Sequence, residues 1–408
     1  MEHIAVVGAS LAGLQAAVAM RRGGYDGRIS LVGDEPHYPY DRPPLSKGYL
    51  AGATDTAALR LRPAADPAET GVDWVLGRRA VGLEWDMDAG GGTIRLDDDE
   101  PLTVDGMVIT TGAAARTLPM AEGVDGVHVL RSLDDADGLR AAFTAGPDRV
   151  VVVGCGFIGA EVAATAREAG LEVTIVEAAP SPLARVLDHQ AGMAVADLHR
   201  SHGVEVRLGV GVAGLTTLDG AVTAVELADG SSIPATLVVI GIGVTPNTGW
   251  LDGSGLRVDD GVVVDETCVA APGVVAAGDV ARWPHRRYGG RLMRIEQWDN
   301  AVEMGRYAGQ RLLAIAEGDN AETPAPFEPV PWFWSDQYDR KMQLAGVVGT
   351  AQEMLQGTFD EGRFVQLHLD DDGVPTGSFC WNRPRQAIMT RQLLAAGAPV
   401  EEFREKLS

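Results

Sequence analysis

The chain of 408 residues contains an internal repeat that restricts its fold more than any other feature of the sequence. Residues 3–34 run from an apolar strand through a glycine turn, an alanine-rich helix and a second strand to Asp34. Residues 149–177 repeat this order and end at Glu177. A strand, turn, helix and strand in this order form the βαβ unit that begins a dinucleotide-binding domain. The repeat therefore predicts two Rossmann-like domains in one α/β chain.

Each predicted domain closes on an apolar strand followed by glycine, the first at Gly112 and the second at Gly243. A third apolar strand over 273–277 precedes Gly278 and Asp279, and a helical pattern follows over 300–316. Prolines then gather at positions 324, 326, 329 and 331, where neither a helix nor a central strand can run. Beyond them the pattern predicts a smaller α+β domain, with strands at 343–348, 364–369 and 378–381 and a helix at 386–396.

The second glycine turn has the full dinucleotide fingerprint. Gly154 allows the tight turn, Gly156 lets the backbone approach a pyrophosphate, and Gly159 lets the helix pack on the strand. The pyrophosphate would lie at the N-terminus of the helix, where free N–H groups and the helix dipole favour an anion. Glu177 can accept hydrogen bonds from both ribose hydroxyls and would repel a 2′-phosphate, which favours NAD over NADP.

The first turn is less regular, because Ser10 replaces the second glycine between Gly8 and Gly13. Serine is small and its hydroxyl can bind a phosphate, so a dinucleotide still fits, and Asp34 supplies the ribose partner. This turn by itself does not distinguish FAD from a second NAD. A contact to the ribityl chain and ring of a flavin would distinguish them. Asp279 could supply that contact, because a carboxylate at the carboxyl end of a strand faces the crevice in which ligands bind to open α/β sheets. The alternative is that Asp279 is an ordinary residue between a strand and a turn.

The composition excludes several classes of partner and site. The 57 acidic and 34 basic side chains give a net charge of −23, which disfavours binding to nucleic acid or to an anionic membrane. No stretch approaches the ~20 apolar residues that span a bilayer. The three cysteines lie far apart in the sequence, so neither a disulfide framework nor a cysteine metal site is expected, and a cytoplasmic location fits.

Taken together, these motifs resemble those of a known family. The paired turns, the Gly112 and Gly278-Asp279 closures, Pro43-Pro44-Leu45-Ser46-Lys47 and the string Trp332-Phe333-Trp334-Ser335-Asp336-Gln337 are similar to those of two-dinucleotide flavoprotein reductases. Within the FAD-dependent pyridine nucleotide-disulfide oxidoreductase superfamily, the chain most resembles the NADH-dependent ferredoxin reductases of bacterial oxygenase systems. The resemblance implies a glutathione-reductase-like arrangement, with FAD bound by 1–112 and 244–322, NAD by 113–243, and a C-terminal α+β domain at 323–408.

The resemblance also implies the cofactor contacts. The positions that match FAD contacts of the family, together with the first turn, are Gly8, Ser10, Ala12, Gly13, Asp34, Lys47, Ala80, Arg131, Asp279 and Trp298. The positions assigned to NAD are Gly154, Gly156, Ile158, Gly159, Glu161, Glu177, Arg185 and Gly243. Trp334 is expected beside the flavin edge, whereas Phe333 is expected to pack in the core.

Lys47 is one of only three lysines in the chain. By resemblance it lies beside the flavin and pairs with Glu161, which makes both residues candidates for catalysis. The lysine would stabilise negative charge on the reduced flavin, and Glu161 would position the nicotinamide. The alternative for Glu161 is that it only complements the dipole of its helix.

The segment around Lys47 contains no cysteine, although disulfide reductases of this architecture carry a redox pair beside the flavin. Electrons would therefore leave directly from the flavin, to oxygen or to a one-electron protein acceptor. The resemblance favours a 2Fe-2S ferredoxin that serves an oxygenase. The alternatives are an NADH oxidase or disulfide reductase, and a redox-responsive interaction protein resembling apoptosis-inducing factor.

An acidic ferredoxin would be repelled by a net charge of −23 unless positive charge is concentrated locally. Between Arg282 and Arg311 there are seven arginines and three acids, which sum to 7 − 3 = +4. Because this stretch includes Trp298 of the expected flavin site, it is the predicted docking surface for the ferredoxin, together with the C-terminal domain. Such complementarity would mainly speed the encounter of the two proteins.

Overall fold

A computed structural model describes residues 1–62, 70–318 and 325–407. They form two compact units. Unit 1 contains 1–41, 59–114 and 245–331, and unit 2 contains 42–58, 115–244 and 332–408, apart from the residues outside the described ranges. Pro324 and the expected domain boundary at 322/323 lie outside the described residues, whereas prolines 326, 329 and 331 lie in the irregular segment that precedes the first C-terminal strand.

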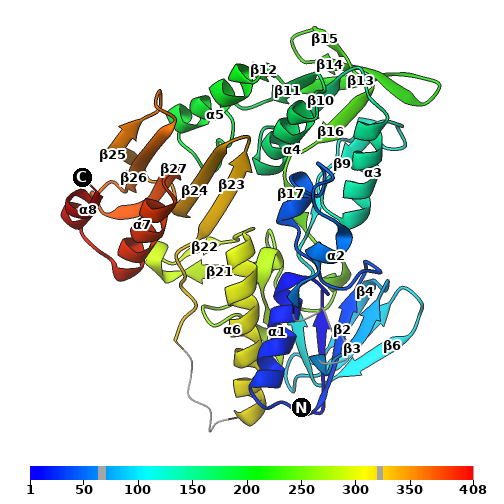
Figure 1. Cartoon of the computed structure of the whole chain (residues 1–408). Helices are drawn as coiled ribbons and strands as arrows, with labels where there is room; N and C mark the ends of the chain where they lie inside the picture. The colour runs from blue at the N-terminus through cyan, green and yellow to red at the C-terminus, as the bar shows by residue number, and fades with distance from the viewer. Residues whose placement is uncertain (63–69, 319–324, 408) are drawn as a thin grey trace. The chain divides into compact units, whose positions relative to one another are not determined.

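Unit 1 is built on a sheet whose order is β19-β20-β7-β1-β2-β3 and in which all strands but β19 run parallel. The strands are β1 (His3–Val7), β2 (Arg28–Gly33), β3 (Asp73–Leu76), β7 (Gly106–Ile109), β19 (Val269–Ala271) and β20 (Val274–Ala276). Helix α1 (Leu11–Arg22) follows β1, and α6 (Trp298–Glu317) packs against it (Figure 1). Glycines permit this contact, because a Cβ on Gly305 would lie 2.4 Å from the backbone oxygen of Ala12.

Two small sheets complete unit 1. The antiparallel sheet of β4 (Ala80–Trp85), β5 (Gly92–Leu96) and β6 (Pro101–Val104) is inserted between β3 and β7. The other has the order β18-β21-β22, with β18 (Val262–Val263), β21 (Ala281–His285) and β22 (Arg291–Met293). Strands β8 (Ala113–Ala115) and β17 (Val244–Pro246) lie where the chain passes from one unit to the other.

Unit 2 repeats the arrangement with a parallel sheet of order β12-β11-β10-β16-β9. Its strands are β9 (Val127–Val129), β10 (Val150–Val153), β11 (Val173–Glu177), β12 (Glu205–Leu208) and β16 (Leu237–Ile240). Its helices are α3 (Leu133–Thr144), α4 (Phe157–Glu168) and α5 (His189–Ser201). Central strands such as β10, four consecutive valines, are buried on both faces, as expected for a parallel sheet covered on both sides.

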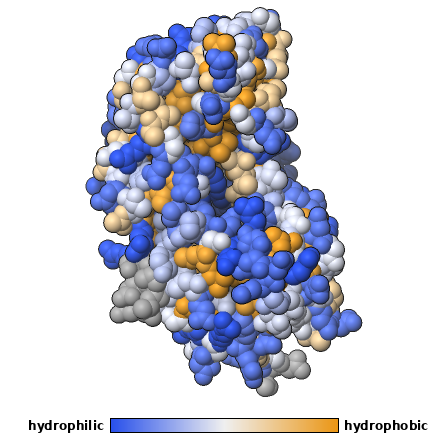
Figure 2. All heavy atoms as spheres, turned by 90° about the vertical axis from the view of Figure 1, so that its right-hand side faces the viewer, coloured by the Kyte–Doolittle hydropathy of each residue, from blue (hydrophilic) through white to orange (hydrophobic). Residues whose placement is uncertain are grey.

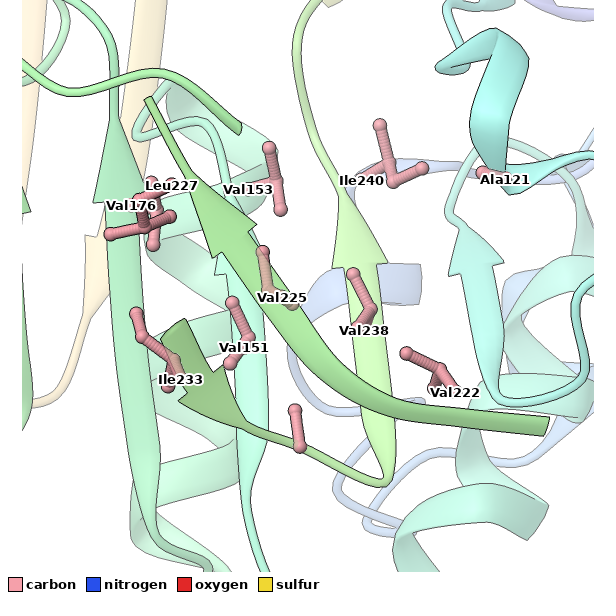
Figure 3. Close-up of a cluster of buried hydrophobic side chains, with 11 residues drawn as sticks. Ala121, Val151, Val153, Val176, Val222, Val225, Leu227, Ile233, Val238 and Ile240 are labelled. Carbon is pink, nitrogen blue, oxygen red and sulfur yellow. The ribbon is translucent and has the colours of Figure 1, made fainter. Parts of the chain in front are cut away.

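An antiparallel sheet of β13 (Val212–Leu218), β14 (Ala221–Leu227) and β15 (Ser232–Pro234) is inserted between β12 and β16. Figure 3 shows how its apolar side chains, among them Val225 and Ile233, pack against Val151 of β10 and Val238 of β16. The internal repeat therefore extends beyond the βαβ beginnings, because both units insert a three-stranded antiparallel sheet before their closing parallel strand.

The C-terminal part belongs to unit 2 and is an antiparallel sheet of order β23-β24-β27-β26-β25. The strands are β23 (Trp332–Gln337), β24 (Arg340–Gly346), β25 (Ala351–Thr358), β26 (Arg363–Leu369) and β27 (Pro375–Trp381). Helices α7 (Pro384–Ala396) and α8 (Val400–Leu407) follow. One face of the sheet, with Phe364 and Phe379, packs on Ala191 and Val195 of α5.

The predicted fold class is confirmed, and each strand and helix expected from the repeat and from the C-terminal pattern overlaps an observed element. The face in Figure 2 is mostly hydrophilic with smaller apolar patches. Among the described residues, no helix is both long enough and apolar enough to cross a membrane.

Candidate active site

The three glycines of the turn in unit 2 differ in whether packing within the protein requires them. Gly154 has φ +96°, and a Cβ there would lie 2.5 Å from the backbone oxygen of Gly241. A Cβ on Gly159 would lie 2.1 Å from the backbone oxygen of Gly154. Both positions therefore require glycine for the backbone to pack. Gly156 differs, because the nearest atom to a Cβ there, again the Gly241 oxygen, is 3.8 Å away. Packing within the protein therefore does not require glycine at position 156, whereas the close approach of a pyrophosphate to the backbone at the N-terminus of the helix would.

Glu177 ends β11 beside this turn, as expected. Its Oε2 accepts the backbone N–H of Cys155 at 2.6 Å, and its Oε1 accepts that of Ala179 at 2.7 Å. Each carboxylate oxygen retains a lone pair for a ribose hydroxyl. The half-buried carboxylate thus fits NAD, and its charge opposes a 2′-phosphate.

The other predicted NAD residues also lie in unit 2. Ile158 is the second residue of α4 and is 42% exposed, although it is large and apolar. Gly243 follows β16, which pairs with β10, and has φ +99°. A Cβ on Gly243 would lie 3.5 Å from Nη1 of Arg185, so the structure places these two residues together. Their contact with the nucleotide remains a prediction.

We expect Gly156→Ala to raise the KM for NADH tenfold or more, a loss of about 1.4 kcal/mol, because the methyl group would obstruct the approach of the pyrophosphate to the backbone of the turn. The backbone there is extended, so the free energy of unfolding should fall by no more than about 1 kcal/mol. The matched control is Gly211→Ala, at a glycine of the same unit with open space around it. NADH kinetics and thermal unfolding measure both effects, and an unchanged KM would place the nucleotide elsewhere.

The glycine turn of unit 1 has the same backbone geometry. Gly8 has φ +121°, and a Cβ there would lie 2.1 Å from the backbone oxygen of Thr110. A Cβ on Gly13 would lie 2.1 Å from the backbone oxygen of Gly8. Ser10 is the N-cap of α1, but its side chain makes no capping hydrogen bond, and Asp34 lies exposed directly after β2. This turn accommodates a second dinucleotide, with the Ser10 hydroxyl at the position of the missing glycine.

The remaining predicted FAD residues divide between the two units. In unit 1, Ala12 lies in α1, Ala80 begins β4, and Asp279 lies in a short 3-10 helix, Gly278–Val280. Trp298 begins α6, and its indole Nε1 donates to Asp41 Oδ1 at 2.7 Å. Arg131 belongs to unit 2, where its backbone oxygen accepts Nη1 of Arg42 at 2.6 Å.

Lys47 and Glu161 form the predicted ion pair. Lys47 follows a short 3-10 helix, Pro43–Ser46, and its Nζ lies 2.6 Å from Glu161 Oε2. The side chain of Lys47 is 22% exposed and that of Glu161 only 3%. Both residues belong to unit 2, and Thr165 Oγ1 of α4 donates to the backbone oxygen of Ser46 at 2.8 Å. Helix α4 therefore holds the lysine-bearing segment through two side chains one turn apart.

Two serines complete the surroundings of the Glu161 carboxylate. Ser46 Oγ donates to Oε2 at 2.5 Å, and Ser335 Oγ of β23 donates to Oε1 at 2.7 Å. With Lys47, three donors face one buried carboxylate, which is more than a residue that only complements a helix dipole requires. Ser335 was not among the predicted site residues. The sequence carries no signal that singles it out, because Ser335 stands in a run of three polar residues, Ser335-Asp336-Gln337.

The aromatic residues that begin β23 have different surroundings. Phe333 packs against Phe157 of α4 with ring centroids 3.6 Å apart and joins the apolar cluster under the C-terminal sheet, which confirms its expected packing role. Trp334 is partly exposed on the same strand. Its expected place beside the flavin edge remains a prediction.

All three cysteines are buried and free. Burial and the nearby Glu177 charge raise the pKa of Cys155 to about 12, and burial raises that of Cys380 to about 12 as well. Burial also raises the pKa of Cys268 well above its usual value. Thiols of this kind stay protonated and inaccessible, so they are poor redox groups.

The two turns, each at the carboxyl edge of a parallel sheet, define a protein that binds two dinucleotides. Residues 2–305 match the family model described as pyridine nucleotide-disulphide oxidoreductase, and residues 332–404 match the one described as reductase C-terminal. The chain belongs to the pyridine nucleotide-disulphide oxidoreductase family. It is an oxidoreductase, and membership implies FAD and NADH as its cofactors, which the two turns fit.

Relatives that match nearly the whole chain show which oxidoreductases it is similar to. The chain is 37% identical to rhodocoxin reductase of Rhodococcus erythropolis, over 97% of this chain and 90% of the relative. It is 35% identical to putidaredoxin reductase of Pseudomonas putida, over 98% and 93% respectively. Among solved structures, a covalent putidaredoxin reductase–putidaredoxin complex is similar with a TM-score of 0.89 and 34% identity, covering 98% of this chain and 94% of that one.

Proposed function

We propose that the protein is a ferredoxin–NAD⁺ reductase, which takes hydride from NADH and delivers single electrons to a 2Fe-2S ferredoxin of a cytoplasmic oxygenase system. The observation that carries this proposal is the ion pair between the partly buried Lys47 and the buried Glu161, which lies in α4 after the NAD-type turn. Family membership and similarity over nearly the whole chain to rhodocoxin reductase and putidaredoxin reductase support it.

We assign FAD to residues 1–112 and 244–322 and NAD to residues 113–243. The bound flavin would accept two electrons as hydride and release them one at a time. Glu161, fixed by its three donors, would hold the nicotinamide amide, while the Lys47 ammonium would stabilise negative charge that develops on the flavin. Trp334 would lie at the flavin edge from which electrons leave.

The state of the cysteines favours a one-electron acceptor over a dithiol. A disulfide reductase needs two thiols within bonding distance beside the flavin, and a peroxidatic oxidase needs an accessible thiolate. In this chain all three thiols are buried and free, with raised pKa values.

The proposed docking stretch, Arg282 to Arg311, is less positive in the fold than in the sequence. Arg282 pairs with Asp259 at 2.8 Å, Arg294 pairs with Asp260 at 3.2 Å, and Arg286 pairs with Glu266. These three acids lie outside the stretch, so including them reduces its sum from +4 to +1. On α6, Arg306 is exposed and Arg311 is partly exposed, with its Nε donating to Thr267 Oγ1 at 3.3 Å. We propose these two arginines as the centre of the ferredoxin surface.

We expect the double variant Arg306→Glu, Arg311→Glu to lower the rate of ferredoxin reduction roughly tenfold at low ionic strength, with a smaller effect at high salt, because screening removes the charge contribution. Ferricyanide reduction, which needs no docking, should stay unchanged. The matched control is Arg95→Glu, an exposed arginine of β5 in the same unit. Equal losses with ferredoxin and ferricyanide would reject the proposed surface.

Steady-state turnover of the FAD-loaded enzyme tests the function itself. With NADH and a 2Fe-2S ferredoxin encoded nearby, we expect ferredoxin-dependent reduction of cytochrome c with little oxygen consumption. Rapid oxygen consumption without ferredoxin would identify an NADH oxidase. Slow reduction by NADH with every acceptor would instead favour a redox-responsive interaction protein.

A further inference from the structure

Glu161 is the end of a buried chain of hydrogen bonds that runs through unit 2. From Ser335 the chain continues to Gln337, whose Nε2 donates to Ser335 Oγ at 3.1 Å, and then to His199 of α5, whose Nε2 lies 3.1 Å from Gln337 Oε1. His199 Nδ1 in turn lies 3.1 Å from the hydroxyl of Tyr338. Ser335, Gln337 and His199 are each no more than 1% exposed.

Only one arrangement of protons gives every hydrogen bond between Glu161 and Tyr338 both a donor and an acceptor. The Glu161 carboxylate can only accept, so the single proton of Ser335 must point to it, and Ser335 must accept from the amide nitrogen of Gln337. The amide oxygen of Gln337 then faces His199 and accepts its Nε2–H. Burial lowers the pKa of His199 to about 4, so the ring is neutral and its Nδ1 accepts the hydroxyl proton of Tyr338.

Tyr338, at the other end of the hydrogen-bond chain from Glu161, is also held in place. Tyr338 stacks on His202 with ring centroids 3.7 Å apart and an interplanar angle of 8°. Burial raises the pKa of its hydroxyl, which therefore keeps its proton. Every donor between Tyr338 and Glu161 thus points towards the carboxylate, and hydrogen bonds aligned in this way polarise one another.

We propose that Ser335, Gln337 and His199 are positioning residues that fix the orientation of the Glu161 carboxylate for hydride transfer. Ser335 occupies Oε1, which leaves Oε2 to face Lys47 and Ser46. The C-terminal sheet therefore contributes to the nicotinamide site through β23, in addition to any role in binding a partner. This inference rests on the proposed function.

Three variants distinguish a positioning role of Ser335 from a role in packing alone. Ser335→Ala removes the donor to Oε1, whereas Ser335→Thr keeps a hydroxyl in the same strand. The matched control is Ser378→Ala in β27 of the same sheet, because Ser378 is 1% exposed and its hydroxyl donates to Thr390 Oγ1 at 2.7 Å, outside the chain. Thermal unfolding shows whether the two alanine variants lose comparable stability.

Single-turnover reduction of the bound flavin at saturating NADH is the first measurement. We expect Ser335→Ala to be slower than wild type by roughly tenfold to a hundredfold, because a misplaced group slows a step that depends on orientation. Ser335→Thr should restore most of the rate, and Ser378→Ala should equal wild type. Equal rates for Ser335→Ala and wild type, or no rescue by threonine, would overturn the proposal.

A double mutant supplies the second test. In the Glu161→Gln background, Ser335→Ala should cause no further loss of rate, because both substitutions act on the same carboxylate. A full additional loss would show that the two residues act independently and would overturn the proposal.

The third measurement does not depend on turnover. Nitrogen-15 NMR of histidine-labelled protein, with His199→Phe used for assignment, should show His199 as the neutral Nε2–H tautomer between pH 5 and 8. A neutral ring with its proton on Nδ1 would reverse the direction of the hydrogen bonds between Tyr338 and Glu161 and contradict the proposal. If NADH fails to reduce the flavin of the wild-type protein, the proposed function is wrong. The tautomer of His199 still tests the direction of the hydrogen bonds in that case.

Discussion

We expect Lys47→Ala to slow flavin reduction by NADH on the order of 10²- to 10³-fold, the loss typical of removing one group that stabilises charge in a transition state. Lys47 brings the only positive charge among the three donors that contact the Glu161 carboxylate, which is 3% exposed. Its removal takes this cation away from a buried carboxylate and removes the positive charge proposed to stabilise the flavin. Stopped-flow reduction at saturating NADH measures the effect.

The control for Lys47→Ala is Lys341→Ala, which removes another lysine of an ion pair in unit 2. Lys341 Nζ lies 2.7 Å from Asp336 Oδ1, but both side chains are about two-fifths exposed, so water can solvate the remaining charge. Lys341→Ala should leave the reduction rate unchanged. If Lys47→Ala also reduces at the wild-type rate, the pair has no part in hydride transfer.

The parts of the fold that could be predicted are those whose pattern is local. Continuous apolar strands, glycine turns and alanine-rich helices indicate both βαβ beginnings, and helical spacing indicates α6 and α7. Strand β23 was not predicted as a strand, because its aromatic run does not alternate between apolar and polar residues. The short, highly charged helix α8 was also missed, because only Phe403 and Leu407 in it are buried.

The site could be predicted only in part. The glycines and Glu177 follow from spacing, but the Lys47–Glu161 pair came from the family resemblance, since no local pattern joins residues so far apart. Ser335 and His199 reach Glu161 through tertiary contacts between β23, α4 and α5 that no linear motif encodes. The charge estimate for the docking stretch was too positive for the same reason, because acids at 259–266 pair with its arginines.

We expect Gly8→Ala to lower the free energy of unfolding by at least about 3 kcal/mol and to abolish stable FAD binding. Gly8 has φ +121°, which L side chains rarely adopt, and its Cβ would lie 2.1 Å from the backbone oxygen of Thr110. No rotamer can relieve an overlap with backbone, so β1 and the segment after β7 would have to separate. The Gly8 N–H donates to the Val32 oxygen of β2 at 2.7 Å, and separation would strain that bond too. Denaturant unfolding and the flavin content of the purified protein measure the two effects.

Gly24→Ala distinguishes the overlap from backbone strain alone, because Gly24 has φ +91° in the same unit but nothing lies within 4 Å of its Cβ position. This variant should lose only about 1 to 2 kcal/mol and keep its flavin. Equal losses in the two variants would mean that left-handed backbone, rather than the close approach to Thr110, is what requires glycine at position 8. A larger loss for Gly8→Ala, accompanied by loss of FAD, would show that the same close packing forms the turn and the cofactor site, so that stability and flavin binding in unit 1 depend on one contact.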